Sequence, residues 1–373
     1  MNRAIALALT GGAMITTMTG CQTMTLTQEQ PVAAPAAAAA TLAMPAQSEF
    51  VTIGAEPMRG VRHIGITVSD IDATLAFYRQ SVPFDVVRRY SVPSSAFPRG
   101  SHDSSSPTVD IALIRTPTVF LQLMDFDPGR TAPPRILPVP GPGYTHICYQ
   151  SPSSAPAYTR FRAAGLAMVS RGDGPVDIGG YGVTYAYGRD PDGTMIEMEQ
   201  LDRPHRADPA WITHIGITTP DIDRAVAFYT NVVGYDPHRR ITTGPNPRLD
   251  AIGDLDGGVI RGSWFAMRNF ELEIWQYLTP ATPQPTGPRM LNTLGHALIA
   301  FEVADIPTEF ARLRNFDVDF IGDPMMMGGW RIQYARDPDG NLFAVQQNVS
   351  AGAAESIETM RWLEPASYRR RTR

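Results

Sequence analysis

The chain has 373 residues, of which 43% are hydrophobic and 18% are charged, a balance that predicts a soluble globular protein with two domains. Its formal net charge of −5 gives no basic surface, which excludes nucleic acid as an expected partner. Two cysteines are too few for a disulfide framework, so each is interpreted by itself.

Residues 1–21 predict a lipoprotein signal peptide. An apolar run, Ala4–Leu9, follows a basic start, and the segment ends at Thr19-Gly20-Cys21. Small residues before a cysteine resemble a bacterial lipobox, so we expect Cys21 to be lipidated and to become the mature N-terminus. An ordinary secretory peptide with a coincidental cysteine is the alternative. The expected location is the periplasmic side of the cell envelope, and Gln22 after the cysteine favours the outer membrane.

Residues 22–58 predict a flexible tether, because Ala, Pro, Thr and Gln dominate them and no apolar periodicity runs through them. No later stretch approaches eighteen consecutive apolar residues. We therefore expect the lipid to be the only contact with the membrane.

The rest of the chain contains a long internal repeat. The segment His63-Ile64-Gly65-Ile66-Thr67 recurs 151 positions later as His214-Ile215-Gly216-Ile217-Thr218, and Ala76-Phe77-Tyr78 recurs as Ala227-Phe228-Tyr229. A second block, from Tyr187 to Gly193 with the sequence Asp-Pro-Asp-Gly at its end, recurs from Tyr334 to Gly340. The two halves therefore share one architecture.

The first unit of each half begins with a strand, because isoleucines alternate with His63, Gly65 and Thr67. Ser69 and Asp72 resemble a capping box that opens a helix through Tyr78. The segments 110–114 and 119–125 then predict a hairpin across Thr116-Pro117.

The second unit repeats this plan. A strand is predicted at Tyr144–Gln150, and a helix at Pro156–Ala164, which Gly165 ends. A strand pair follows around the turn Asp190–Gly193, whose Asp, Pro and Gly residues are typical of tight turns.

The order strand, helix, strand, strand, strand is predicted four times along the chain. This pattern resembles the vicinal-oxygen-chelate (VOC) superfamily, which includes glyoxalases, bleomycin-resistance proteins and extradiol dioxygenases. The resemblance covers residues 59 to about 348. It implies an α+β fold of four βαβββ modules paired into two tandem VOC domains, at 59–203 and 208–348, with a C-terminal tail at 349–373. Each domain is then expected to pair its own two modules into a cupped sheet around a metal.

The resemblance also implies metal-ligand positions on the first and last strands of the modules. They fall on His63, Gln122, His146 and Glu197 in the first domain. In the second domain they fall on His214, Glu273 and His296, with Ala344 where a glutamate is usual. Imidazole and carboxylate donors suit a divalent ion such as Fe, Mn, Zn, Ni or Co.

Two alternatives remain at this stage. A single histidine on a strand is often only a buried, hydrogen-bonded residue, and the C-terminal half is either a second metal site or a scaffold. Cys148 shares a strand face with His146, and a small buried thiol is its simplest interpretation.

The expected function is that of an exported metal-dependent VOC enzyme of the glyoxalase-like lyase or isomerase type, which chelates a small oxygenated substrate through two oxygens. Glu197 is its expected catalytic residue. An Fe(II) extradiol ring-cleavage dioxygenase and a non-catalytic small-molecule binding or resistance protein are the alternatives. Export argues against dependence on cytosolic glutathione.

Overall fold

The computed structural model describes residues 50–53, 58–129, 134–316, 318–350, 354–363 and 367–370. The predicted signal peptide, Cys21 and most of the predicted tether lie outside the described residues. The prediction that the flexible tether continues to residue 58 is wrong. Within that range β1 (Phe50–Ile53) is a strand, and it pairs antiparallel with β19 (Ser367–Arg370). The first and last described segments of the chain are therefore joined by a two-stranded sheet.

Four modules follow one another along the chain, as predicted. Module 1 contains β2 (Met58–Thr67), α1 (Ile71–Ser81), β3 (Asp85–Pro93), η1 (Ser94–Ala96), β4 (Thr108–Arg115) and β5 (Phe120–Asp125). Module 2 contains β6 (Gly143–Pro152), α2 (Ala157–Ala163), β7 (Ala167–Met168), β8 (Val176–Asp177), β9 (Val183–Arg189) and β10 (Met195–Leu201).

Module 3 contains β11 (Trp211–Thr218), α3 (Ile222–Val233), β12 (Arg239–Thr243), α4 (Pro247–Gly253), β13 (Val259–Ala266) and β14 (Glu271–Thr279). Module 4 contains β15 (Gly295–Val303), α5 (Ile306–Leu313), η2 (Arg314–Phe316), β16 (Asp319–Met327), β17 (Trp330–Arg336) and β18 (Leu342–Asn348). A short turn, η3 (Ile357–Thr359), follows module 4.

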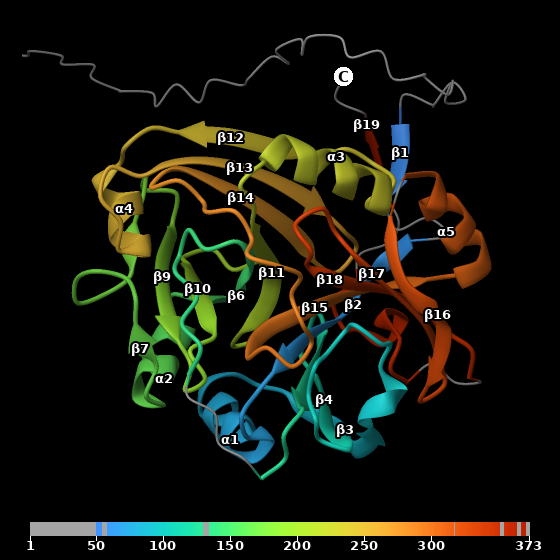
Figure 1. The fold of residues 1–373 in the computed structure, drawn as a ribbon. Helices are drawn as coiled ribbons and strands as arrows, with labels where there is room; N and C mark the ends of the chain where they lie inside the picture. The colour runs from blue at the N-terminus through green and yellow to red at the C-terminus, as the bar shows by residue number, and fades with distance from the viewer. Residues whose placement is uncertain are drawn as a thin grey trace, which may run out of the picture.

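The modules do not pair within each half of the chain. Modules 2 and 3 form one sheet, in the order β12-β13-β14-β11-β6-β10-β9-β7 with β8 on β9, and we call its concave side the middle cup. Modules 1 and 4 form the other, in the order β16-β17-β18-β15-β2-β5-β4-β3, and its concave side is the end cup. Figure 1 shows blue β2 beside orange β15, and green β6 beside olive β11. The prediction that each domain pairs its own two modules is therefore wrong.

The short connection 202–210 accounts for this arrangement. It leads from β10 into β11, which lies antiparallel to β6, the parallel neighbour of β10. The indole of Trp211 at the start of β11 donates a 2.9 Å hydrogen bond to the side-chain oxygen of Gln150 near the end of β6. This contact adds to the backbone ladder between β11 and β6, while β2 pairs with β15 in the other sheet.

The helices of modules 1 and 3 begin at an aspartate. Asp70 accepts a 2.9 Å hydrogen bond from the backbone N–H of Ala73, and Asp221 accepts a 3.0 Å bond from that of Arg224. Each side chain thereby satisfies a backbone donor that the first turn leaves unpaired. The predicted capping box at Ser69 is wrong, because the Ser69 hydroxyl donates to Asp192 instead.

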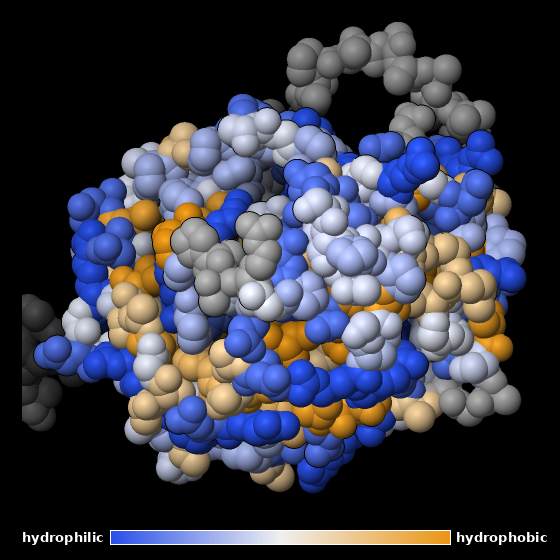
Figure 2. All heavy atoms as spheres, turned by 60° about the horizontal axis from the view of Figure 1, so that its bottom comes forward, coloured by the Kyte–Doolittle hydropathy of each residue, from blue (hydrophilic) through white to orange (hydrophobic). Residues whose placement is uncertain are grey.

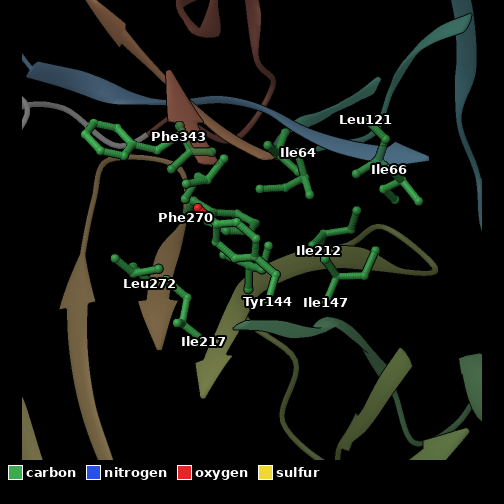
Figure 3. Packing of buried hydrophobic residues seen from close by; sticks show 14 of the residues in the cluster. Ile64, Ile66, Leu121, Tyr144, Ile147, Ile212, Ile217, Phe270, Leu272 and Phe343 are labelled. Atoms are coloured by element: carbon green, nitrogen blue, oxygen red, sulfur yellow. The ribbon is translucent and has the colours of Figure 1, made fainter. Parts of the chain in front are cut away.

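The convex faces of the two sheets share one hydrophobic core. Ile64 and Ile66 of β2 pack there with Ile215 and Ile217 of β11, as the alternation of the strands predicts. Figure 3 shows this contact between central strands of both sheets, with Tyr144 of β6 in the middle. The histidines that alternate with these isoleucines consequently face the cups.

The described surface offers no broad apolar area. Its exposed large hydrophobic residues are scattered, and they are Ile136, Tyr181, Leu278, Met326 and Val349. On the face shown in Figure 2, apolar stretches are interrupted by hydrophilic rows. Among the described helices, none has the length and apolar character needed to span a bilayer.

Candidate metal centre

Four adjacent strands of the middle cup each direct one metal-binding type of side chain to the same point: His146 (β6), Glu197 (β10), His214 (β11) and Glu273 (β14). The Nε2 atom of His214 lies 2.7 Å from Oε2 of Glu197 and 3.3 Å from Oε2 of Glu273. The Nε2 atom of His146 lies 3.4 Å and 3.1 Å from the same two oxygens. All four side chains are buried.

The absence of a side chain at Gly216 makes room for the His146 ring. Gly216 lies opposite His146 in the β6–β11 pair. A Cβ atom at Gly216 would fall 2.6 Å from Nδ1 and 2.8 Å from Nε2 of that imidazole, closer than packed atoms approach. A glycine at this position of β11 therefore leaves the space that the His146 ring occupies.

Neighbouring side chains fix the orientation of two of the four groups. The indole Nε1 of Trp264 donates a 2.6 Å hydrogen bond to Oε1 of Glu273, which leaves Oε2 directed at the histidines. The Thr145 hydroxyl lies 3.0 Å from Nδ1 of His146, and the ring of Tyr187 lies 5.2 Å from that imidazole between centroids. Such contacts set the tautomer and direction of metal ligands.

At these groups the attraction between opposite charges shifts the pKa more than burial does. Burial by itself would raise the pKa of Glu197, but hydrogen bonds from His146 and His214 lower it far below its ordinary value. Burial would lower the pKa of His214, yet the carboxylates of Glu273 and Glu197 raise it to about 10. Two carboxylates thus face two imidazoles away from water, an arrangement in which a cation is strongly favoured.

The residues present fit a divalent transition metal. Two imidazole nitrogens and two carboxylate oxygens lie within 4.8 Å of one another, and this mixed N/O donor set is what Zn, Ni, Co, Mn and Fe(II) accept. Among the described residues, the end cup contains no comparable cluster.

The predicted ligand sets are regrouped by the structure. His146 and Glu197 of the first set join His214 and Glu273 of the second, whereas His63 and Gln122 lie on β2 and β5 of the other sheet. His296 is not at a ligand position, because its Nε2 lies 3.1 Å from the backbone carbonyl of Met195. The grouping into one site per half is therefore wrong, and the physical reason is the pairing of modules 2 and 3.

Sequence reasoning missed two features of this site. The role of Trp264 has no signal in the sequence, because it depends on the β13–β14 register that places Trp264 opposite Glu273. The grouping itself has a signal: the two middle modules keep their carboxylates, and the two end modules have Gln122 and Ala344 instead.

Two further polar groups lie beyond the four donors in the middle cup. Cys148 is buried, and burial raises the pKa of its thiol well above the ordinary value, which keeps it protonated. Glu199 accepts a 2.6 Å hydrogen bond from the Gln150 amide, and burial raises the pKa of this carboxyl to about 7. The interpretation of Cys148 as a small buried thiol agrees with this environment.

One protein family matches most of the described chain, and individual relatives match about half of it or less. A family model described as Glyoxalase/Bleomycin resistance protein/Dioxygenase superfamily matches residues 60–198 and 211–345. A putative lactoylglutathione lyase of Brassica oleracea var. gemmifera is 27% identical over 195 residues, which are 51% of this chain and 59% of that relative. An ethylmalonyl-CoA/methylmalonyl-CoA epimerase of Cereibacter sphaeroides is 23% identical over 142 residues, which are 38% of this chain and 97% of that relative.

A solved structure has the same architecture. A point mutant of glyoxalase I from Zea mays superposes with a TM-score of 0.55 at 15% sequence identity, covering 81% of this chain and 96% of that one. At this identity the likeness concerns the fold, and it confirms the prediction of two tandem glyoxalase-like domains.

Proposed function

The chain belongs to the Glyoxalase/Bleomycin resistance protein/Dioxygenase superfamily, and we propose that it is a metal-dependent lyase or isomerase within it. The observation that carries the proposal is the buried cluster of His146, Glu197, His214 and Glu273. The names of its relatives, a lactoylglutathione lyase and a CoA-ester epimerase, agree with proton transfer next to a carbonyl group.

In this proposal Nε2 of His146, Nε2 of His214 and one carboxylate oxygen each of Glu197 and Glu273 hold the ion. A bound divalent metal supplies Lewis acidity to a substrate with two neighbouring oxygens, which acidifies the adjacent C–H bond. These four groups would supply the protein ligands, and an ion held by them would bind the substrate through its remaining coordination positions.

Glu197 is the residue that we propose to move the proton. The indole of Trp264 holds Glu273 at Oε1, whereas Glu197 contacts the two histidines and the weakly donating thiol of Cys148. Because Glu197 is ionised and sits in a cup that excludes bulk water, its carboxylate can accept a proton from a bound carbon acid and return it.

Proton exchange at carbon tests this proposal. The metal-loaded protein is incubated in D₂O with the methylglyoxal hemithioacetals of glutathione and of 2-mercaptoethanol, and deuterium in the product is followed by NMR. We expect metal-dependent turnover that Glu197→Gln abolishes. Turnover of the 2-mercaptoethanol adduct alone would place glutathione outside the substrate class.

Two other outcomes contradict the proposal. Oxygen uptake with catechol, and no turnover of either adduct, would identify a ring-cleavage dioxygenase. Absence of bound metal after loading with Ni, Co, Zn, Mn or Fe(II) would leave a binding protein without metal chemistry. The four-donor set with two carboxylates favours the lyase or isomerase over both.

We also propose that Cys21 is lipidated and that the protein works on the periplasmic side of the envelope, on the sequence pattern described above. Membrane fractionation of cells expressing the full chain, with Cys21→Ser as the control, tests this independently of activity. Wild-type protein that is soluble without detergent contradicts the anchor.

A further inference from the structure

The end cup carries the same four positions as the metal centre, with different residues. His63 occupies the position of His214, Gln122 that of Glu273, and Ala344 that of Glu197. Leu298 occupies the position of His146, because Leu298 lies opposite Gly65 as His146 lies opposite Gly216. Of the four donors of the metal centre, these positions of the end cup therefore keep one imidazole and no carboxylate.

The hydrogen-bond partner of His63 determines which of its nitrogens carries the proton. The Nη1 atom of Arg62 lies 2.8 Å from Nδ1 of His63. Since a guanidinium can only donate, Nδ1 accepts this bond and the proton resides on Nε2. Burial and the Arg62 charge lower the pKa of His63 well below its ordinary value, so the ring is neutral.

Arg62 is itself held in place. Its guanidinium lies 3.9 Å from the ring centroid of Trp330, donates a 3.0 Å hydrogen bond to Gln346, and forms a 3.0 Å ion pair with Glu355. The charge of Arg62 is thereby neutralised at the wall of the cup, and its partners hold the guanidinium beside His63. The tautomer of His63 is a fixed property of the cup.

The proton on Nε2 has no acceptor. This buried atom has no hydrogen-bond partner among the described residues, and the position where Glu197 meets His214 is held here by the methyl group of Ala344. A buried N–H without an acceptor is costly to the fold. The structure therefore contains a directed donor that a bound molecule would satisfy.

The walls of the end cup are apolar and aromatic. Its buried lining includes Met124, Phe126, Trp330, Ile332 and Tyr334. Gln122 keeps 6% of its surface exposed although β5 is an interior strand of the sheet and α1 packs on the opposite face. Gln122 adds a polar amide to this wall on β5, next to β2.

We propose that the end cup is a second, metal-free binding site for an uncharged organic molecule with an aromatic or aliphatic ring and a carbonyl oxygen. The ring packs against the apolar wall, and the carbonyl oxygen accepts a hydrogen bond from Nε2–H of His63. The Gln122 amide is the nearest polar group on the neighbouring strand. A charged ligand is disfavoured, because the described residues of the cup offer no free counter-ion for it.

Histidine NMR on the full-length, metal-loaded protein, with acetophenone as the probe, tests the site. In the ¹⁵N-labelled protein we expect His63 in the neutral Nε2–H form, with an Nε2–H signal that shifts on addition of acetophenone. His63→Phe should weaken the binding of acetophenone by about tenfold, as expected for loss of a buried hydrogen bond. His214→Ala, which removes a residue of the metal centre, should leave this binding unchanged and separates the two cups.

Ala344→Leu tests the space in the cup. We expect this variant to fold with an unchanged melting temperature and to lose acetophenone binding, because its larger side chain fills the ligand position. Three results overturn the proposal: an Nδ1–H tautomer at His63, an Nε2–H signal that acetophenone does not shift, or an Ala344→Leu protein that is strongly destabilised. The last would mean that the cup is already filled by its own side chains.

Discussion

The Nε2 atom of His214 lies 2.7 Å from Oε2 of Glu197, although the two residues belong to different halves of the sequence repeat. Their contact depends on β11 pairing with β6, which has β10 on its other side. The metal centre therefore takes ligands from both halves of the repeat. Of the two equivalent histidines, only His214 belongs to it, so substitutions of His63 and His214 should affect metal binding differently.

His214→Ala should reduce bound metal from about one ion per chain to less than a tenth of that after dialysis, because loss of a ligand removes a donor from the centre. His63→Ala is the matched control, since it changes the equivalent residue of the end cup and should leave the metal content unchanged. Elemental analysis of the purified proteins measures both. Equal loss of metal in the two variants would contradict the assignment to the middle cup.

Trp264→Phe should weaken metal binding by about 10- to 100-fold, the usual effect of losing a group that orients a ligand. The variant keeps an aromatic ring but loses the hydrogen bond to Oε1 of Glu273, so that carboxylate is free to rotate. Competition with a chromogenic chelator measures the affinity.

Trp275→Phe is the control for this prediction, because Trp275 packs edge-on against Trp264, 5.1 Å away between ring centroids, and its own indole nitrogen has no hydrogen-bond partner among the described residues. Its affinity for metal should equal that of the wild type. A Trp264→Phe protein with unchanged affinity would show that the Glu273 carboxylate is oriented without the indole.

Gly216→Ala should abolish metal binding in a folded protein, because the new methyl group would occupy the space of the His146 ring. Gly65→Ala places a methyl group 2.9 Å from Cβ of Leu298 in the end cup, so it should lower stability but leave metal content unchanged. Elemental analysis together with thermal unfolding separates the two effects. Full metal occupancy in Gly216→Ala would mean that His146 is not a ligand.

Periodicity and the long repeat were sufficient to predict the four modules. The hairpin at 110–125 and the helix at 156–164 appear in the structure as β4–β5 and α2, because they follow from local turns and alternation. Which modules share a sheet is decided by contacts between distant strands, and the repeat alone leaves it open. The sequence shows that the first strand of each half carries a histidine. It does not show which residues of other strands lie beside that histidine.

The assignment of His296 as a ligand fails for a related reason. Aligning Gly143 with Gly295, which both start a strand, places His296 beside Tyr144 and Leu298 beside His146. The hydroxyl of Tyr144 donates to the Leu342 carbonyl, and His296 contacts the Met195 carbonyl. These two residues therefore have equivalent structural roles. Strict alternation would keep His296 on the same face as Leu298, and the register shift between these two residues in the β15–β2 pair is what turns His296 away from the cup.

The last prediction concerns pH and a carboxyl group outside both cups. Asp190, in the turn before β10, accepts backbone hydrogen bonds from Asp192 and Thr194 through Oδ1 and faces the hydroxyl of Tyr78, 3.4 Å from Oδ2. Burial raises its pKa to about 7, against an ordinary value of 3.8. Between these two values the folded protein keeps a proton that the unfolded chain has lost, so this group makes stability fall as the pH rises from about 4 to about 7.

Asp190→Asn keeps an oxygen for both backbone donors and cannot ionise, so the variant should escape this loss. Relative to the wild type, its free energy of unfolding should rise by about 2 kcal/mol between pH 5 and pH 8, from the size of the raised pKa. Urea titrations at both pH values measure the difference. Asp337→Asn, at the equivalent turn where burial raises the pKa to about 6, should show the same sign with a smaller size. An Asp190→Asn protein that follows the wild-type pH profile would show that Asp190 is already ionised at pH 5 in the folded state.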